Sequence, residues 1–233
     1  MDGYLDSIET MSTKDGPGIR SVIFMQGCKL RCLFCHNPET WSNKYNLEIS
    51  ADELLKRILK FKNYYGNNGG VTFSGGEPLL QPKFLIEILK KLKDFGIHTC
   101  LDTAGCGIGY YEEVLKYVDL VILDIKATNS EKYFELTGNK MDEYNKFLEV
   151  CKKLNKKLWL RQVIVPGIND TLEYINELKE YIKNIPNVEK VELLPYTTLG
   201  IKKYQELGIK YKLENVPSMD NKKIMELSNL LIK

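Results

Sequence analysis

Residues 28–35, Cys-Lys-Leu-Arg-Cys-Leu-Phe-Cys, follow an apolar segment that is typical of a β-strand, and they space three cysteines as C-x3-C-x2-C. The thiolates of Cys28, Cys32 and Cys35 can bind three irons of a [4Fe-4S] cluster, which leaves the fourth iron open to a second molecule. Groups that follow a strand lie at its carboxyl end, where α/β folds gather their functional residues. The motif therefore predicts a metal centre with an open iron and places it in an α/β fold.

Two other interpretations of these cysteines have to be weighed. Cys32 and Cys35 alone match a redox disulfide or half of a zinc site. A structural zinc ion usually has four ligands, and the fourth candidate is His36, which directly follows Cys35. Adjacent side chains cannot easily reach one tetrahedral ion while two further cysteines also bind it. A redox pair leaves Cys28 without a role, so the cluster is the interpretation that uses all three cysteines.

The size and charge of the chain favour a cytoplasmic protein with a single domain over residues 1–233. Its 233 residues are 43% hydrophobic, which is enough for one sizeable core. Because 33 basic residues nearly balance 31 acidic ones, giving a net charge of +2, a broad surface for nucleic acid or membranes is not expected. No stretch is long and apolar enough to cross a bilayer, and residues 1–10 lack the apolar core of a secretory leader. The cysteines are therefore expected to be reduced thiols.

Short β-branched runs alternate with amphipathic helical stretches along the chain. The expected strands are residues 19–26, 70–74, 98–103, 120–125, 158–165 and 188–194. Helices are expected from the cap at Ser50 to Gly66, from Pro82 to Gly96, after Asp170, and over about 218–232, whereas residues 128–141 are expected to be a loop that covers the site. This alternation predicts parallel strands joined by right-handed crossovers, in a curved open sheet or an incomplete barrel.

Polar residues and glycines stand at the ends of nearly all these expected strands. They are Cys28 after the first, Ser74 to Pro78 after the second, Asp102 and Thr103 in the third, Asp124 and Lys126 at the fourth, and Pro195 to Thr197 after the sixth. Because the carboxyl ends of parallel strands meet at one rim, we expect these groups to converge. Seen singly, the glycines could form only a turn and the aspartates could cap helices. Arg161, inside an apolar strand, needs a carboxylate from the protein or from a ligand.

The motifs taken together resemble the radical S-adenosylmethionine (radical SAM) superfamily, and within it the family of pyruvate formate-lyase activating enzymes. The resemblance starts with the cysteine motif, with Phe34 before the last cysteine, and with the turn at Gly75, Gly76 and Glu77. It extends along the chain in blocks at residues 15–20, 26–37, 74–77, 97–103, 119–126, 163–167 and 188–196. Blocks that match in order over nearly the whole chain are far more specific than any one of them.

The resemblance implies a partial (β/α)6 barrel of parallel strands, with a [4Fe-4S] cluster on Cys28, Cys32 and Cys35 and S-adenosylmethionine on its open iron. It implies these contacts to S-adenosylmethionine: Gly75, Gly76 and Glu77 at the amino group, Lys126 and Arg161 near the carboxylate or the methionine portion, and the backbone around Phe34 and His36 at the adenine. Asp102, Thr103 and Asp124 match positions that help to hold a monovalent cation, and Ile125 belongs to the same cofactor-binding segment. The candidate catalytic residues are Cys28, Cys32, Cys35, Lys126 and Arg161.

The activity that the resemblance implies is the production of a glycyl radical in a partner enzyme. An electron from the reduced cluster splits S-adenosylmethionine into methionine and a 5′-deoxyadenosyl radical, which takes a hydrogen atom from a glycine of pyruvate formate-lyase or of another glycyl-radical enzyme. The segment with Asp15, Gly16 and Arg20 matches the loop that meets the partner's glycine loop, and the implied electron donor is a flavodoxin or a ferredoxin.

Two details refine the resemblance, and two alternatives stay open. The absence of cysteine from residues 37–70 matches the compact members of the family, while Thr197 stands where they have a histidine, so that no cofactor contact is assigned to it. One alternative is a compact radical SAM enzyme that acts on a small molecule, although the loop at Asp15 argues against it. The other is a zinc-binding module without activity, which would be colourless, whereas a cluster protein prepared without oxygen is brown.

Overall fold

The computed structural model describes residues 1–42 and 44–232. Its strands are β1 (Asp2–Ser12), β2 (Arg20–Met25), β3 (Leu47–Ser50), β4 (Gly70–Gly75), β5 (His98–Thr103), β6 (Leu120–Asp124), β7 (Lys157–Ile164) and β8 (Val188–Pro195). Its α-helices are α1 (Ala51–Leu59), α2 (Pro82–Asp94), α3 (Tyr111–Leu115), α4 (Ser130–Thr137), α5 (Asp142–Lys153), α6 (Leu172–Lys183), α7 (Ile201–Glu206) and α8 (Asn221–Ile232). Short 3-10 helices are η1 (Pro38–Trp41), η2 (Lys62–Tyr64) and η3 (Pro78–Leu80).

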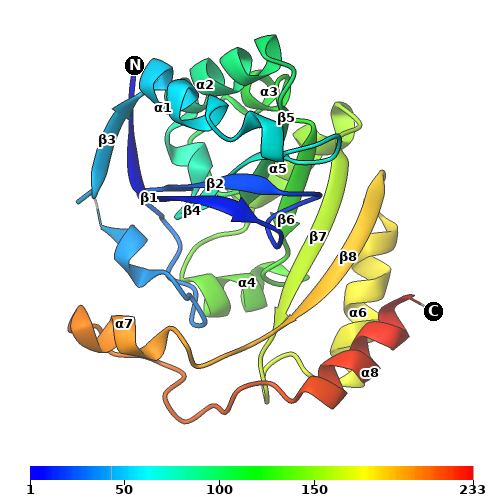
Figure 1. The fold of residues 1–233 in the computed structure, drawn as a ribbon. Helices are drawn as coiled ribbons and strands as arrows, with labels where there is room; N and C mark the ends of the chain where they lie inside the picture. The colour runs from blue at the N-terminus through cyan, green and yellow to red at the C-terminus, as the bar shows by residue number, and fades with distance from the viewer. Residues whose placement is uncertain (43, 233) are drawn as a thin grey trace.

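These strands form one curved sheet in the order β3-β1-β2-β4-β5-β6-β7-β8 (Figure 1). The six strands from β2 to β8 in this order are parallel, and their central residues, such as Phe73 and Leu101, are buried side by side. Within the described residues, β3 and β8 end the order and do not pair with one another, so the sheet is not a closed barrel. The predicted α/β fold with six parallel strands in an incomplete barrel is confirmed.

The strands β1 and β3 are additions to the six strands that the sequence predicts. β1 pairs antiparallel with both β2 and β3. Only Gly3 and Leu5 of β1 are buried, so its apolar pattern is too weak to predict a strand from periodicity. β3 has four residues, which is too short to show a period. Their pairing covers the edge of the sheet beside β2.

The crossover helices begin at the predicted caps. Ser50 accepts a hydrogen bond from the N–H of Glu53 at 3.2 Å, and α2 begins at Pro82 and stops just before Gly96. The end predicted for α1 at Gly66 is wrong, because the helix stops at Leu59 and the chain continues as η2. A hydrogen bond of 2.7 Å between the hydroxyls of Tyr65 and Ser21 holds this turn against β2.

Residues 128–141 are not the loop that was expected, because most of them form α4. Asn129 caps its start by accepting from the N–H of Lys132, and Gly138, with φ +69°, ends it. The last carbonyl groups of α4 receive hydrogen bonds from the cysteine loop: Thr137 O accepts from Arg31 N at 2.7 Å, and Leu136 O accepts from Leu33 N at 2.9 Å. The helix therefore supports residues 28–35.

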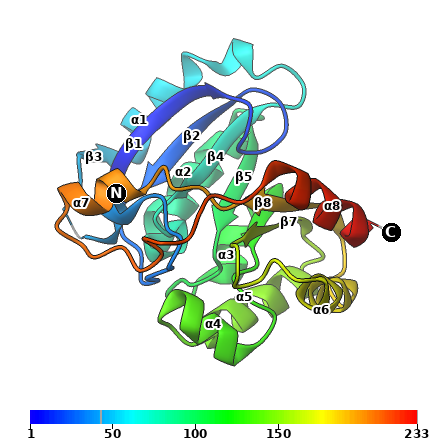
Figure 2. The same ribbon diagram turned by 90° about the horizontal axis from the view of Figure 1, so that it is seen from below.

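The two carboxyl-terminal helices, α7 and α8, pack against different parts of the molecule. α8 packs on β8 beside α6, with Ile224 and Leu227 buried, and it starts three residues later than the expected position (Figure 2). α7 lies apart from these helices and contacts η1, next to the cysteine loop. None of the helices in the described ranges combines the length and apolar composition needed to cross a membrane.

Candidate functional site

A cavity of about 390 Å³ opens at the carboxyl ends of the parallel strands, a size in the range of small-molecule sites. Its wall combines the cysteine loop and η1 with the ends of β4 to β8. The lining residues are Cys28, Leu30, Cys32, Phe34, Cys35, His36, Asn37, Thr40, Trp41, Ser74, Gly75, Gly76, Asp102, Thr103, Ala104, Asp124, Lys126, Val163, Leu194 and Pro195. Most of the residues predicted for the site meet here, although they are scattered along the sequence.

The cysteine loop is braced by hydrogen bonds to its carbonyl groups. Arg31 Nη1 donates to the carbonyl oxygens of Cys28 and Leu30, both at 2.8 Å. Tyr204 Oη, from α7, donates to the carbonyl oxygen of Cys35 at 3.1 Å. Together with the two bonds from the loop to α4, these contacts fix the backbone on which the thiols are carried.

The three thiols of the loop are free and line one cavity. Burial raises the pKa of Cys32 to about 12 and also raises the pKa values of Cys28 and Cys35. Iron binds the thiolate form, so assembly of a metal centre here has to release protons. Three sulfur donors on one wall of a cavity fit a [4Fe-4S] cluster bound through three of its irons.

The arrangement does not favour the zinc alternative. Within residues 1–42 and 44–232, no three His, Cys, Asp or Glu side chains are grouped closely enough to hold a single metal ion. His36, the proposed fourth ligand, faces another segment: its Nε2 lies 3.2 Å from the carbonyl oxygen of Thr197 and 3.3 Å from its hydroxyl. His36 therefore contacts Thr197, the residue to which no cofactor contact was assigned.

The two glycines after β4 approach neighbouring backbone too closely to carry a side chain. A Cβ on Gly75, where φ is +107°, would lie 2.4 Å from Met25 N. A Cβ on Gly76 would lie 2.2 Å from the carbonyl oxygen of Gly27. Both residues must be glycine to bring this turn against the cysteine loop, and both line the cavity.

Glu77 lies behind the cavity wall. Its side chain is fully buried and accepts hydrogen bonds from Thr103 Oγ1 at 2.6 Å, Ala104 N at 3.0 Å and Leu79 N at 3.1 Å. Burial raises the pKa of Glu77, and these hydrogen bonds oppose that rise. Glu77 thus joins the turn after β4 to the loop after β5, and its side chain is not part of the cavity lining.

Three charged groups line the opposite wall. Lys126 Nζ pairs with Asp124 Oδ2 at 2.6 Å and lies 5.4 Å from the centre of the Phe34 ring. Ser74 Oγ donates to Asp102 Oδ2 at 2.8 Å. Burial, and then the charge of Asp124, raise the pKa of Asp102 to about 7. This wall therefore carries one cation and two carboxylates, and the negative charge of Asp124 opposes the ionisation of Asp102.

Arg161 lies beside the cavity and is not part of its lining. Its Nε pairs with Glu192 Oε2 at 3.0 Å, and its Nη1 lies 3.9 Å from Asp102 Oδ2, so that it has the carboxylate partners predicted for it. Its Nη2 donates to the carbonyl oxygen of Lys14 at 2.8 Å. Ile125 is also outside the lining: it is buried, and its N–H donates to the carbonyl oxygen of Arg161 at 2.7 Å.

The loop between β1 and β2 has two further anchors inside the sheet. Thr72 Oγ1 donates to the carbonyl oxygen of Asp15 at 2.6 Å, and Arg20 Nη1 donates to that of Pro17 at 2.9 Å. Gly16, with φ +127°, is buried between them. The predicted partner-contact residues Asp15 and Gly16 therefore lie in a loop that is tied to the strands through its carbonyl groups.

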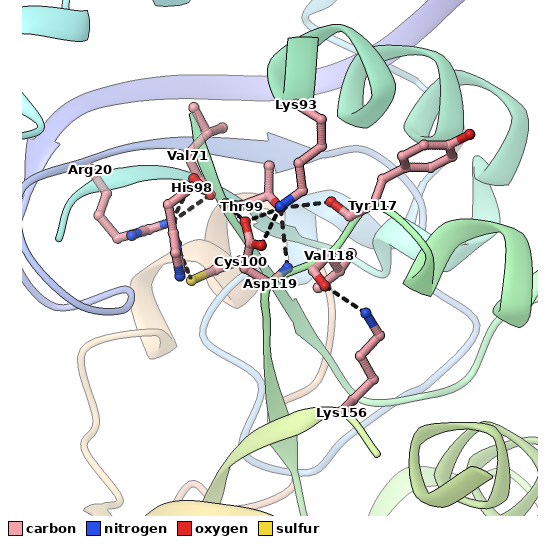
Figure 3. Close-up of polar contacts among 10 residues, drawn as sticks. All are labelled: Arg20, Val71, Lys93, His98, Thr99, Cys100, Tyr117, Val118, Asp119 and Lys156. Carbon is pink, nitrogen blue, oxygen red and sulfur yellow. Dashed lines mark hydrogen bonds and ion pairs between the residues drawn. The ribbon is translucent and has the colours of Figure 1, made fainter. Parts of the chain in front are cut away.

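Arg20 itself does not support the direct partner contact that was predicted, because it is fully buried. Figure 3 shows it beside His98 and Cys100 at the start of β5, while Thr99 faces Asp119 and Lys93. This alternation follows from the two faces of a strand. The network lies at the amino-terminal ends of the strands, away from the cysteine loop.

Several cavity residues were missed at the sequence level. Leu30, Asn37, Thr40, Trp41, Val163 and Leu194 line the cavity without being predicted. Val163 and Leu194 lie at the ends of β7 and β8, so the rule that found the other strand ends could have found them. Thr40 and Trp41 belong to η1, and no local pattern shows that η1 folds back over the cysteine loop.

Comparisons with known proteins agree with this geometry. The sequence profile of the radical SAM superfamily matches residues 22–182. The pyruvate formate-lyase-activating enzyme of Clostridium pasteurianum is 53% identical over 98% of this chain and 97% of its own length. The protein of the same name from Staphylococcus epidermidis is 45% identical over 97% and 94%. Among solved structures, Streptococcus suis SuiB bound to the precursor peptide SuiA has the same fold, with a TM-score of 0.69 and 19% identity over 91% of this chain and 44% of that one.

Proposed function

The chain belongs to the radical SAM superfamily, and from that premise we propose that it activates pyruvate formate-lyase by reductive cleavage of S-adenosylmethionine. The observation that carries the proposal is the meeting of three free thiols with Gly75, Gly76 and Lys126 around one cavity. When bound and reduced, a [4Fe-4S] cluster on these thiols supplies the electron that releases a 5′-deoxyadenosyl radical, which removes a hydrogen atom from a glycine of the partner.

The residues of the chain bind and orient the cofactor in this proposal. Lys126 is the cation for the carboxylate of S-adenosylmethionine, since it lines the cavity and its present partner Asp124 can be exchanged for another carboxylate. The carbonyl groups of Gly75 and Gly76 are the acceptors for its amino group, because backbone without side chains is exposed there. The loop segment from Phe34 to His36 meets the adenine.

We further propose a monovalent cation between Asp102 and Asp124. Two carboxylates on one wall, only one of which has a cationic partner within 3 Å, leave room for a second positive charge. A cation there would lower the pKa of Asp102, and Thr103 would add an oxygen ligand. Arg161 and Glu77 support this wall from behind.

The loop with Asp15 and Gly16 is the proposed contact for the glycine loop of the partner. Arg161 Nη1 lies 3.9 Å from Asp102 Oδ2, at the cofactor wall, and Arg161 Nη2 donates to the carbonyl oxygen of Lys14, so that one side chain lies between the proposed cofactor and partner sites. Arg20 acts as a positioning residue below this loop. The same proposal includes a single domain over residues 1–233, action in the cytoplasm, and a flavodoxin or ferredoxin as electron donor.

The test is electron paramagnetic resonance on the anaerobically reconstituted protein, reduced and mixed with S-adenosylmethionine and the pyruvate formate-lyase of the same organism. 5′-Deoxyadenosine is measured in the same tube. Cys32→Ala should abolish both products, whereas Cys151→Ala, at a buried cysteine outside the cavity, should keep both. A glycyl-radical doublet is the expected result.

Other outcomes separate the remaining alternatives. Deoxyadenosine without a doublet would keep the cofactor chemistry and point to another glycyl-radical enzyme or to a small molecule as the substrate. Neither product from a sample with a full complement of iron and sulfide would contradict the proposed function.

A further inference from the structure

A second cavity lies on the outer side of the cysteine loop. It has a volume of about 210 Å³ and is lined by Arg31, Cys32, Leu33, Trp41, Tyr204, Ile209, Lys210 and Lys212. Cys32 and Trp41 line this cavity and the inner one alike. The two cavities therefore share two wall residues, and one of these is a cysteine of the loop.

The outer cavity carries positive charge only. Arg31, Lys210 and Lys212 are exposed, and none of its lining residues is acidic. None of these three cations takes part in an ion pair with another residue in the described ranges. We call these three residues the basic face.

The basic face contacts the backbone of the cysteine loop directly through Arg31 and indirectly through Trp41 and Tyr204. The Arg31 guanidinium lies 4.9 Å from the centre of the Trp41 ring while it donates to the carbonyl oxygen of Cys28. Trp41 packs edge-on against Tyr204, with ring centres 5.6 Å apart, and Tyr204 bonds the Cys35 carbonyl oxygen. A molecule seated on this face would rest on side chains that themselves touch the peptide groups of two of the three cysteines.

The inner cavity is not the place for an electron carrier to dock. In the proposed function it holds S-adenosylmethionine and must stay open to the glycine loop of the partner. The outer cavity gives a second approach to the cysteine loop, at Cys32. Resting on that function, we propose that the basic face is the docking surface of a small, acidic one-electron carrier protein, which reduces the metal centre from outside while the inner cavity is occupied.

The step transfers one electron and no atoms. The carrier is oxidised by one electron and the centre on Cys28, Cys32 and Cys35 is reduced by one, so no proton has to cross the wall. Opposite charges on the two surfaces speed their encounter and orient it, and salt weakens the effect. Docking on the outside also lets reduction and partner binding take place on the same molecule without competition.

The test uses the double variant Lys210→Glu/Lys212→Glu in the reconstituted holoenzyme. Arg31 is left unchanged because it also braces the loop. The matched control is Lys83→Glu/Lys90→Glu, which reverses the charge of two exposed lysines on α2 and so changes the net charge by the same amount. Two quantities are measured: the association of an oxidised acidic flavodoxin, from its flavin fluorescence anisotropy, and the rate at which the reduced flavodoxin bleaches the visible absorbance of the cluster. Dithionite, a small reductant, replaces the flavodoxin in a parallel series.

The expected result is roughly tenfold or greater loss of flavodoxin affinity and reduction rate at low salt, converging with wild type at high salt, and an unchanged rate with dithionite. Lys83→Glu/Lys90→Glu should match wild type. Wild-type behaviour of the double variant with flavodoxin would overturn the proposal, and so would an equal loss with dithionite, since the lysines would then act on the cluster itself. Neither readout needs the partner enzyme, so failure to form a glycyl radical would contradict the proposed function alone.

Discussion

Replacement of Arg20 by methionine tests how the partner-facing loop is held. The guanidinium is fully buried and donates to Thr72 Oγ1 at 2.7 Å, to the carbonyl oxygen of Val71 at 2.7 Å and to that of Pro17 at 2.9 Å. Methionine fills much of the same space but donates nothing. Thr72 in turn holds the Asp15 carbonyl, so the substitution removes one anchor of the loop and loosens the next.

The size of the effect follows from two opposing contributions. Hydrogen bonds from a charged donor are worth roughly 1.5–3 kcal/mol each, and the substitution removes these three short ones together with two longer contacts of 3.3 Å to His98. Burial of the guanidinium without a carboxylate partner costs several kcal/mol, which methionine recovers. We expect a net loss of about 2–4 kcal/mol in the free energy of unfolding. For a chain of this length, that loss lowers Tm by roughly 4–16 °C.

The assay is thermal unfolding of the cluster-free protein, paired with activation of the partner and cleavage of S-adenosylmethionine without partner. Arg57→Met is the matched control: its guanidinium pairs with Glu53 on the surface of α1, and its loss should cost no more than about 0.5 kcal/mol. Partner activation by Arg20→Met should fall further than partner-free cleavage. A Tm within 2 °C of wild type, or an equal loss in both reactions, would show that Arg20 does not hold the partner-facing loop.

Three further substitutions test the site. Glu77→Ala leaves buried donors without an acceptor and should cost about 3–5 kcal/mol in chemical unfolding, with Glu77→Gln less damaging; equal losses would contradict this account. Because the pKa of Asp102 is raised to about 7, its protonated form contributes stability that is lost as pH rises to that value. Asp102→Asn should therefore gain stability relative to wild type by up to about 1.4 kcal/mol per pH unit as pH rises from about 4, the ordinary pKa of an aspartate, to about 7, and should gain no more above 7; melting at pH 5, 7 and 8.5 measures this, and a constant difference between pH 5 and pH 7 would argue against the assignment. Gly76→Ala, with its Cβ 2.2 Å from the Gly27 carbonyl, should displace the turn and abolish S-adenosylmethionine cleavage, and wild-type turnover would contradict it.

Much of the fold could be predicted because six strands carry a strong apolar signal and follow one another in parallel order. The chemistry at the rim followed from the same rule, since residues that end parallel strands meet whatever their distance in sequence. α4 was predicted as a loop although its signals were present: Asn129 is a helix cap and Gly138 a helix end. The helix between them has only eight residues and a weak apolar stripe, so its periodicity did not predict a helix.

Three of the predicted site residues lie outside the cavity lining for one shared reason. The pattern identifies Arg20, Glu77 and Arg161 as functional, but it cannot show which side of the wall each occupies. Their positions depend on contacts with residues distant in the chain, such as the bond from Arg161 to the Lys14 carbonyl. The basic face is equally invisible in sequence, because Lys210 and Lys212 meet Arg31 only after α7 folds back over η1.

A barrel hydrogen-bonded all the way round can be entered only through its two mouths, by a small molecule or by a free chain end. In the described part of this chain the last seam is missing, since β3 and β8 are the two ends of the strand order. Because no backbone ladder joins these two strands, a hairpin whose ends are both anchored in a large folded protein does not have to be threaded through a closed ring of strands. An incomplete barrel can therefore receive a glycine from the middle of a folded chain, which a closed barrel could not receive without threading.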